Sequence, residues 1–250
     1  MKENQKKIWI TGASSGIGKA VAEKFASEGW KVAVSARRKE LLDELAKNQN
    51  ITSFPLDVTD QTQITNVFKN ILNEFGGLDV CLFSSGTYEP KDEKSIDPHK
   101  IKNVINVNFL GVIDCVKAVE DYFKNKKSGH ISVVSSIAGY RGLPNSSGYG
   151  PSKAALTNFS ESIYFDFKKF GVRVSIVSPG FIKTPLTDKN EFSMPFLKTP
   201  EYAAEKIFNG LVKSNSFEIH FPMGLTLTLK FLRILPYKLY LFLVDKLVKR

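Results

Sequence analysis

The stretch Thr11 to Gly18, TGASSGIG, lies between a short apolar run, Lys7 to Thr11, and a helical pattern from Ile17 to Glu28. Glycines between a strand and a helix let the backbone approach a pyrophosphate, and the helix N-terminus offers free N–H groups and a positive dipole end. The alternative is a glycine-rich turn without a ligand, which the flanking strand and helix disfavour. The stretch therefore predicts the first half of a βαβ unit with a phosphate-binding turn.

Strands and helices alternate along the rest of the chain. Apolar runs such as Val80 to Phe83 lack period-2 alternation, which indicates burial on both faces and hence a parallel sheet covered by helices. The expected strands are Lys7–Thr11, Lys31–Ala36, Ile51–Leu56, Leu78–Ser84, His130–Ser135, Arg173–Val177 and Phe217–Phe221. The expected helices are Ile17–Glu28, Lys39–Asn48, Gln61–Phe75, Lys102–Lys126, Ser152–Phe170 and Pro200–Lys213. We expect a single-domain α/β fold, a Rossmann-like, doubly wound sheet of seven parallel strands that binds ligands outside their carboxyl ends.

Cysteines and histidines give no sign of a metal site or a disulfide framework. Cys81 and Cys115 lie inside apolar runs, and His99, His130 and His220 are isolated from one another and from both cysteines in the sequence. Zinc sites and disulfide-rich domains need closely spaced ligands or paired cysteines. We therefore expect no metal and a reducing, cytoplasmic setting.

The glycine-rich turn is followed, in order, by the other motifs of a known family. Tyr149 and Lys153 match a Tyr-x-x-x-Lys motif, Ser136 lies thirteen residues upstream at the end of an expected strand, and Asn108 stands in Asn-Phe-Leu-Gly. With the turn at Gly12, this set resembles the short-chain dehydrogenase/reductase family over roughly residues 6 to 222. The resemblance implies an oxidoreductase that acts on CH–OH and C=O groups.

The spacing of Tyr149 and Lys153 suits acid–base chemistry. Residues four apart on a helix share a face, which brings the Lys153 ammonium beside the Tyr149 phenol, and a nearby cation lowers a tyrosine pKa towards a useful range. The resemblance implies that Tyr149 is the general acid/base, Lys153 also binds the nicotinamide ribose, Ser136 holds the substrate oxygen and Asn108 supports a proton-relaying water. An ordinary exposed pair of side chains is the alternative.

Arginine at the end of the second expected strand favours NADP(H) over NAD(H). NAD-preferring relatives carry an acid there, whereas this chain has Ala36 followed by Arg37 and Arg38. Arg37 is expected to pair with the 2′-phosphate through its planar guanidinium group. The alternative is that both arginines are solvated charges at the start of a helix.

The resemblance also implies which residues contact the cofactor. They are Gly12, Ser14, Ser15, Gly16, Ile17, Gly18, Arg37, Asp57, Val58, Gly86, Tyr149, Lys153, Pro179, Gly180, Ile182 and Thr184. One departure is plain, because the family's Asn-Asn-Ala-Gly is replaced by Phe83-Ser84-Ser85-Gly86. Phe83 cannot supply the hydrogen bonds of an amide, so the usual polar link within the sheet is in doubt.

A loop from Leu186 to Thr199 carries Phe192, Met194, Phe196 and Leu197. In the family this segment covers the substrate, so its apolar content favours a hydrophobic carbonyl compound or alcohol. Packing of these side chains on the domain is the alternative.

The last part of the chain combines apolar and basic residues. Thr226 to Arg250 holds six basic residues and one acid, half of the net charge of +10. We expect an NADP(H)-binding catalytic domain over residues 1–222 and an amphipathic basic extension over residues 223–250. No charge-free stretch is long enough to span a bilayer. The helical face formed by Leu239, Phe242, Leu243 and Leu247 is expected to contact the domain, a partner subunit or a membrane surface.

These patterns favour a hydride-transferring reductase or dehydrogenase that uses NADP(H) and a small hydrophobic carbonyl or alcohol substrate. A 3-oxoacyl-[acyl-carrier-protein] reductase is the alternative within the enzymes, and a non-catalytic NADP(H)-binding sensor or scaffold is the alternative outside them. The resemblance implies a homodimer or homotetramer paired through the helices at Lys102–Lys126 and Ser152–Phe170. No nucleic acid is expected as a partner, and the location is expected to be cytoplasmic, with peripheral membrane contact as a variant.

Overall fold

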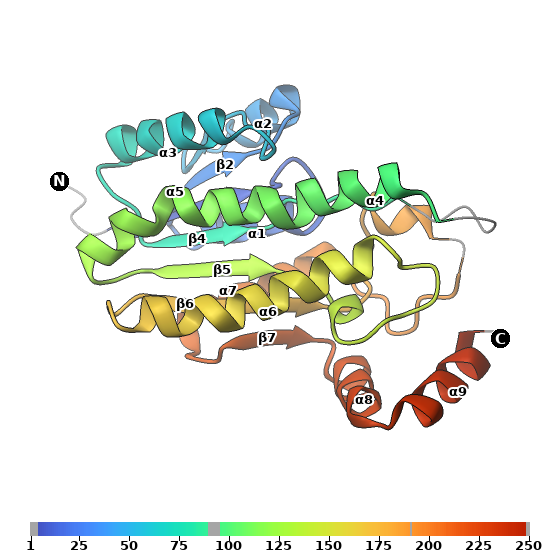
Figure 1. Cartoon of the computed structure of the whole chain (residues 1–250). Helices are drawn as coiled ribbons and strands as arrows, with labels where there is room; N and C mark the ends of the chain where they lie inside the picture. Colours follow the sequence, from blue (N-terminus) through green and yellow to red (C-terminus); the bar gives the residue numbers. More distant parts are fainter. Residues whose placement is uncertain (1–4, 90–95, 191, 249–250) are drawn as a thin grey trace.

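The computed structural model describes residues 5–89, 96–190 and 192–248, and it contains one sheet of seven parallel strands (Figure 1). The strands lie in the order β3-β2-β1-β4-β5-β6-β7. Their bounds are β1 Lys7–Thr11, β2 Lys31–Ser35, β3 Ile51–Ser53, β4 Val80–Phe83, β5 His130–Val134, β6 Arg173–Pro179 and β7 Glu218–Phe221. The order reverses between β1 and β4, so the sheet is doubly wound and its switch point lies at their carboxyl ends. The expected fold class is confirmed.

Helices cover both faces of the sheet. They are α1 Gly16–Ser27, α2 Lys39–Leu45, α3 Gln61–Phe75, α4 Pro98–Ile105, α5 Gly111–Lys126, α6 Tyr149–Lys168, α7 Pro200–Lys213, α8 Met223–Ile234 and α9 Tyr237–Val248. Short turns of helix are η1 Asn106–Leu110, η2 Ile137–Gly139 and η3 Thr187–Lys189. Because side chains alternate along a strand, Ile8 and Ile10 pack under α1 and α7, while Trp9 packs under α3 and α5. The molecule therefore has one apolar core on each face of the sheet.

The helix expected from Lys102 begins earlier and is interrupted. Pro98 stands in the first turn of α4, and the Asp97 carboxylate accepts from the backbone N–H groups of His99 and Lys100. This is the N-cap arrangement that Asp followed by Pro favours. A π-helical turn, η1, then separates α4 from α5.

Other boundaries differ by a few residues. The expected helices Gln61–Phe75 and Pro200–Lys213 match α3 and α7, whereas α6 begins at Tyr149 instead of Ser152. Its first turn is held by the Ser146 hydroxyl, which accepts from the N–H of Gly150 at 2.9 Å. Tyr149 is therefore a helix residue, and Lys153 lies one turn further along the same helix.

An aromatic pair stands where the family has an amide. Phe83 is fully buried, and its ring meets that of Trp9 edge-on, with 5.6 Å between the centroids. The indole N–H of Trp9 donates to Ser35 Oγ at 3.0 Å. The backbone N–H groups of Ser84 and Ser85 donate to Thr11 Oγ1 at 3.2 and 3.3 Å, so β1 and β4 keep a polar link without the asparagine.

The chain ends in two helices beyond β7, α8 and α9, which we call the C-terminal hairpin (Figure 1). Of the face expected to make contacts on α9, Leu239 and Phe242 are exposed and Leu243 is half-buried, whereas Tyr240 and Val244 are buried against α8. The side chain of Leu247 lies outside the described residues. Within this chain the exposed part of that face does not pack on the described domain, so contact with a partner subunit or a membrane surface stays a prediction. Within the described ranges, no helix is long and apolar enough to cross a membrane.

Candidate active site

A pocket of about 280 Å³ opens at the carboxyl ends of the central strands. Its wall comes from segments that are far apart in the sequence but meet at the switch point of the sheet. Of the residues expected to hold a cofactor, it contains Gly12, Ser14, Ser15, Gly16, Ile17, Gly18, Arg37, Asp57, Val58, Gly86, Tyr149, Lys153, Pro179 and Thr184. The glycine-rich turn and the Tyr149–Lys153 pair therefore share one cavity.

Two expected cofactor residues stand behind this wall. Ile182 is 2% exposed and belongs to the core under α1 and α7. A side chain at Gly180 would meet Pro222 and Leu225 at 3.0 Å, so Gly180 permits close packing of α8 against β6. The described pocket wall includes their neighbours Pro179 and Thr184 instead.

The glycine-rich turn is shaped by close backbone contacts. Gly12 has φ +69°, and an added Cβ would lie 2.7 Å from the carbonyl oxygen of Ser84. A Cβ at Gly18 would lie 2.4 Å from the carbonyl oxygen of Gly12. The first contact joins the turn to the loop after β4, and the second closes it onto α1. Neither position tolerates a side chain, which keeps the N-terminus of α1 open to a ligand.

Arg38 reaches the glycine-rich turn directly. Its Nη2 donates to Ser14 Oγ at 2.8 Å and to Ser15 Oγ at 2.9 Å. Arg37, which we expected to bind a phosphate, is exposed and lines the same pocket. Sequence reasoning missed Arg38 as a site residue, although the Arg-Arg pair was visible. Both cations lie at the end of the pocket next to β2.

Lys153 is buried beside the tyrosine. Its Nζ lies 5.6 Å from the centroid of the Tyr149 ring and donates to the carbonyl oxygen of Val134 at 2.8 Å. The side chain is 3% exposed, and burial lowers the pKa of Lys153 to about 8. The helical spacing therefore brings the two groups together as expected, with the ammonium turned towards the end of β5.

The pKa of Tyr149 does not follow the expected direction. Burial raises the pKa of this phenol to about 12, and a hydrogen bond with Ser136 acts in the opposite sense. The net shift is upward, opposite to the direction expected from Lys153, because desolvation of the phenolate is its largest cause. The ring of Tyr88 meets that of Tyr149 edge-on at 5.6 Å and adds to the apolar surroundings. Tyr88 carries no motif, so the sequence did not point to it.

Ser136 and Asn108 support the same site. Ser136 is the second residue after β5 and caps η2, where its Oγ accepts from the N–H of Ala138 at 3.2 Å. Asn108 is fully buried in η1; its Oδ1 accepts from the N–H of Thr87 at 2.7 Å, and its Nδ2 donates to Ser152 Oγ at 3.1 Å. Asn108 thus connects the loop after β4 to the first turn of α6.

Gly86 lies between two of these polar groups. An added Cβ would lie 3.6 Å from both Asn108 Oδ1 and Lys153 Nζ. The four expected catalytic residues therefore lie close together: Tyr149 and Lys153 on α6 line the pocket, while Ser136 at the start of η2 and Asn108 in η1 lie next to them. In the described parts of the chain, no group of histidine, cysteine, aspartate and glutamate could hold a metal ion.

Comparisons with known proteins agree with this geometry. The family model of the short chain dehydrogenases matches residues 6–194. An uncharacterized oxidoreductase of Myxococcus xanthus is 34% identical over 236 residues, covering 92% of this chain and 93% of the relative. The 3-oxoacyl-[acyl-carrier-protein] reductase FabG of Thermotoga maritima is 34% identical over 194 residues, covering 76% of this chain and 79% of the relative.

Solved structures share the fold over nearly the whole length. A short-chain dehydrogenase from Streptomyces avermitilis superposes with a TM-score of 0.82 at 24% identity and covers 98% of both chains. ElxO with NADP bound superposes with a TM-score of 0.80 at 28% identity, covering 90% of this chain and all of that one. Together with the family model, which matches more than half of the sequence, these similarities show that the chain is an oxidoreductase of the short-chain dehydrogenase family.

Proposed function

We propose that the protein transfers hydride between NADP(H) and the carbonyl or secondary alcohol of a hydrophobic substrate, with Tyr149 as the general acid and base. The observation that carries this proposal is that Tyr149 and Lys153 line the pocket whose other end is the glycine-rich turn, with Ser136 close enough to Tyr149 to lower the pKa of its phenol. A hydroxyl pair at that position can hold a substrate oxygen and exchange a proton with it.

The pocket suits a dinucleotide with a 2′-phosphate. Gly12 and Gly18 permit the close backbone contacts that shape the turn, and the residues at the N-terminus of α1, Gly16 to Gly18, line the pocket. Arg37 and Arg38 supply positive charge next to β2. Ala36 stands at the position of the acid in NAD-preferring relatives, so no carboxylate repels a 2′-phosphate there. NADP is bound in the ElxO structure, which supports the same cofactor here. When bound, the nicotinamide supplies or accepts the hydride.

The residues of the chain manage the proton. With a pKa near 12, the Tyr149 phenol is protonated at neutral pH and can donate to a substrate oxygen that gains charge as hydride arrives. The Lys153 ammonium, with a pKa near 8, is mostly charged at that pH and stabilises the phenolate left behind. Ser136 keeps the phenol oriented by their hydrogen bond.

Replacement of the phenol tests this role. Tyr149→Phe should lower kcat for reduction of a verified carbonyl substrate by at least about a hundredfold, as loss of a general acid does. Tyr149→Phe should bind NADPH with an unchanged Kd in a fluorescence titration, because the glycine-rich turn is intact. A variant that turns over at the normal rate would contradict the proposed mechanism.

Cofactor choice is tested at the two arginines. Arg38→Ser should raise KM for NADPH and leave KM for NADH nearly unchanged, since a bidentate arginine–phosphate contact is lost only with NADPH. Arg37→Ser measures how much the second cation contributes to the preference for NADPH. Equal efficiency of the unaltered protein with NADPH and NADH would overturn the assignment.

Hydrophobic side chains beside the site favour an apolar substrate. Phe192, Phe196 and Leu197 in the loop after β6 are 47%, 58% and 41% exposed, so they do not fill the core of the domain. Phe192 meets Phe181, which follows β6, with 5.9 Å between the ring centroids. This loop is available to cover an apolar substrate. A panel of long-chain and aromatic ketones tested with NADPH should contain a substrate. Activity confined to small polar carbonyls would contradict the proposed preference for an apolar substrate.

A second candidate is the reduction of 3-oxoacyl chains on an acyl carrier protein. The relative from Thermotoga maritima that carries this name is 34% identical over 194 residues. Comparison of kcat/KM for a carrier-linked 3-oxoacyl chain and for the same chain as a free thioester separates the candidates. A large advantage of the carrier-linked form would favour the second one.

A further inference from the structure

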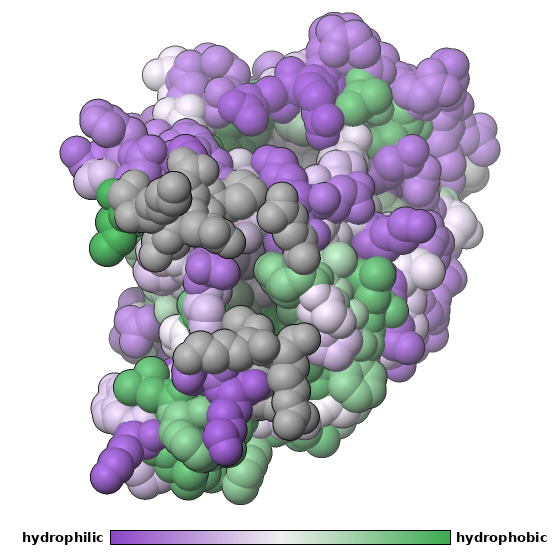
Figure 2. Space-filling view, turned by 90° about the vertical axis from the view of Figure 1, so that its right-hand side faces the viewer, coloured by the Kyte–Doolittle hydropathy of each residue, from purple (hydrophilic) through white to green (hydrophobic). Residues whose placement is uncertain are grey.

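We infer that the C-terminal hairpin is a docking surface for an anionic lipid bilayer. The hairpin and the mouth of the pocket both lie at the carboxyl ends of the strands, the face seen in Figure 2. Apolar and hydrophilic side chains intermix over the lower part of this face, where α8 and α9 lie. The inference concerns binding and does not depend on the proposed reaction.

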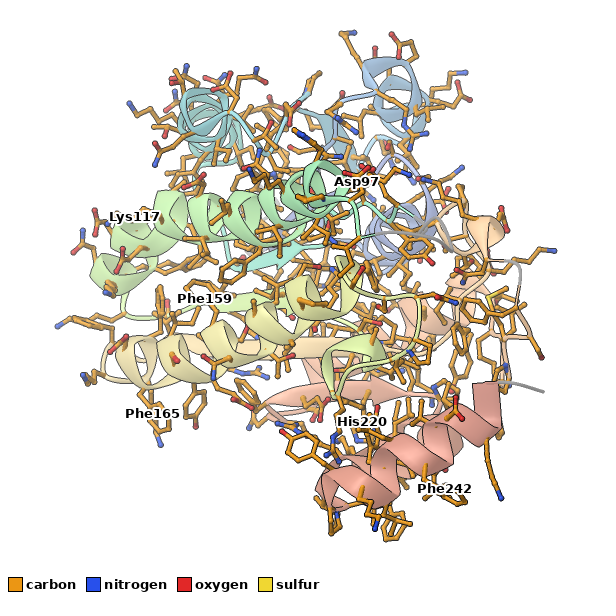
Figure 3. All side chains as sticks on the ribbon, turned by 45° about the vertical axis from the view of Figure 1, so that its right-hand side comes forward. Asp97, Lys117, Phe159, Phe165, His220 and Phe242 are labelled. Atoms are coloured by element: carbon orange, nitrogen blue, oxygen red, sulfur yellow. The ribbon has the colours of Figure 1, made fainter. Side chains whose placement is uncertain are left out.

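Both helices of the hairpin expose large apolar side chains. On α8, Leu227, Phe231 and Ile234 are 51%, 60% and 76% exposed, and on α9, Leu241 and Phe242 are 60% and 54% exposed. Single exposed apolar residues are common on soluble proteins, but a cluster within two consecutive short helices is not. Phe242 projects from the outer side of α9, away from the sheet (Figure 3). We call these five side chains the apolar edge of the hairpin.

The inner side of the hairpin is already occupied. Leu232, Tyr240 and Val244 are buried in a small core between α8 and α9, and Leu225 packs on Ile137 and Tyr140. The exposed apolar side chains are therefore left over after the hairpin has folded onto the domain. Further packing within this chain does not account for them.

The charged side chains around the apolar edge indicate an anionic partner. Arg233, Lys238 and Lys246 are exposed, while Lys230 forms an ion pair with Glu218. Asp245 is the only acid in residues 223–250, and Lys249 and Arg250 continue the basic sequence. A second copy of this chain would bring like charges together across the same face, which opposes a symmetric dimer there. Anionic lipid headgroups complement the charge instead.

The mixture of exposed apolar and basic side chains favours a bilayer over an acidic protein. Apolar side chains flanked by lysine and arginine are typical of helices that lie in the interface of an anionic bilayer. Lys246 lies over the ring of Phe242 at 4.6 Å, so one cation and one apolar group would reach the headgroup region together. This mode of binding does not require a helix that crosses the bilayer.

Vesicle cosedimentation of the full chain tests the inference. The protein should bind vesicles of phosphatidylcholine with phosphatidylglycerol and should not bind vesicles of phosphatidylcholine alone. Leu241→Ser should weaken partitioning roughly tenfold through lost apolar burial. Its matched control is Leu41→Ser, an exposed leucine on α2, which should leave partitioning unchanged.

Two charge-removing substitutions and a measurement of the molecular mass in solution complete the test. Lys238→Gln with Lys246→Gln should weaken partitioning about 25-fold, because each cation near an anionic surface contributes about fivefold. Thermal unfolding of each variant checks that the fold is kept, since all altered side chains are exposed. Equal sedimentation with and without anionic vesicles would overturn the inference. So would a dimer in solution that Leu241→Ser dissociates, because the edge would then be a protein interface.

Discussion

Lys153 is a buried cation whose charge the fold disfavours. Its pKa is lowered to about 8 by burial, whereas an unfolded lysine titrates near 10.5. Between these two values the unfolded chain holds a proton that the native state has lost. Stability therefore rises with pH through that window, and the native state is least favoured by this group below about pH 8. The proposed chemistry needs this side chain in its charged form. Burial of that charge in the site therefore lowers the stability of the protein.

The first prediction compares the protein with Lys153→Met. Between about pH 8 and 10.5, the unfolding free energy of the unaltered protein should rise relative to that of the variant by up to about 3 kcal/mol. Urea unfolding at a series of pH values measures the difference. A difference that stays flat over this window would show that Lys153 keeps an ordinary pKa in the folded protein.

A second buried group makes the protein sensitive to acid. His130 at the start of β5 is 4% exposed, its Nε2 lies 2.7 Å from Ser175 Oγ, and burial lowers its pKa to about 3. Between about pH 3 and 6.5 the unfolded chain binds a proton that the native state excludes, so stability falls as pH falls through that range. The full effect is on the order of 4 kcal/mol.

His130→Leu separates this effect from general acid denaturation. The variant should lose part of its stability at neutral pH, because Ser175 loses a partner, but its stability should depend less on pH below 6.5. Denaturant midpoints at several pH values test both statements. Parallel curves for the two proteins would show that His130 is not the sensitive group.

Individual site residues were predictable where a motif fixes both type and spacing. Tyr149 and Lys153 on α6, Ser136 at the start of η2 and Asn108 in η1 meet because the fold brings these segments to the carboxyl ends of the central strands. The pKa of Tyr149 was not predictable, because burial depends on neighbours such as Tyr88 that carry no motif. The contact of Arg38 with Ser14 and Ser15 was not predictable either. The backbone after β2 decides which of the two adjacent arginine side chains turns inward.

At the scale of elements, β1 and β4 are joined by a contact that the family pattern does not contain. Phe83 and Trp9 are both fully buried and meet edge-on. Phe83→Asn would restore the family residue but bury an amide beside an aromatic ring and leave a cavity. The substitution should lower the unfolding free energy by roughly 3 to 5 kcal/mol.

Urea unfolding measures the effect of Phe83→Asn, with Ser84→Asn as the control. Ser84 is half-buried at the pocket, where an amide can reach water, so this variant should stay close to the unaltered protein in stability. A Phe83→Asn variant as stable as the unaltered protein would mean that the amide finds partners in the sheet. In that case the aromatic pair would not be a substitute for the family's polar link.

Element types followed from periodicity more reliably than element ends. The strands were predicted because their apolar residues are buried on both faces, and the bounds of α3 were predicted from its periodicity, although its Asp60 cap and Gly76 end were not noted. The start of α4 was signalled by Asp97-Pro98 but overlooked in favour of the apolar pattern. The π-helical turn at η1 leaves no pattern in the sequence, because it depends on how α4 and α5 both pack beside α6.

At the scale of the whole molecule, one arginine ties the C-terminal hairpin to the active-site side of the domain. Arg141 follows η2, and its Nη1 donates to the carbonyl oxygens of Leu232, Arg233 and Leu235 at 3.2, 3.1 and 2.7 Å. These carbonyls lie at the end of α8, where helical N–H partners run out, although Leu232 also accepts from the N–H of Leu235 at 3.3 Å. The guanidinium also lies 4.0 Å from the centroid of the Tyr240 ring. This side chain thus joins segments about a hundred residues apart, beside the packing of Leu225 on Ile137 and Tyr140.

The last prediction follows from this contact. Arg141→Met keeps the length of the side chain but removes the charge and every donor, so the end of α8 loses its cap and the α8–α9 pair should open more often. Hydrogen bonds from a charged group contribute about 1.5 to 3 kcal/mol each, so even one lost contact raises local opening at least about tenfold. Limited proteolysis should therefore cut Arg141→Met within residues 223–248 at least about tenfold faster, while NADPH binding at the distant glycine-rich turn stays unchanged. Arg141→Lys, which keeps a cation but not the planar fork, should fall between the two. If all three proteins are cut at the same rate, the hairpin is held by its apolar core of Leu232, Tyr240 and Val244 alone.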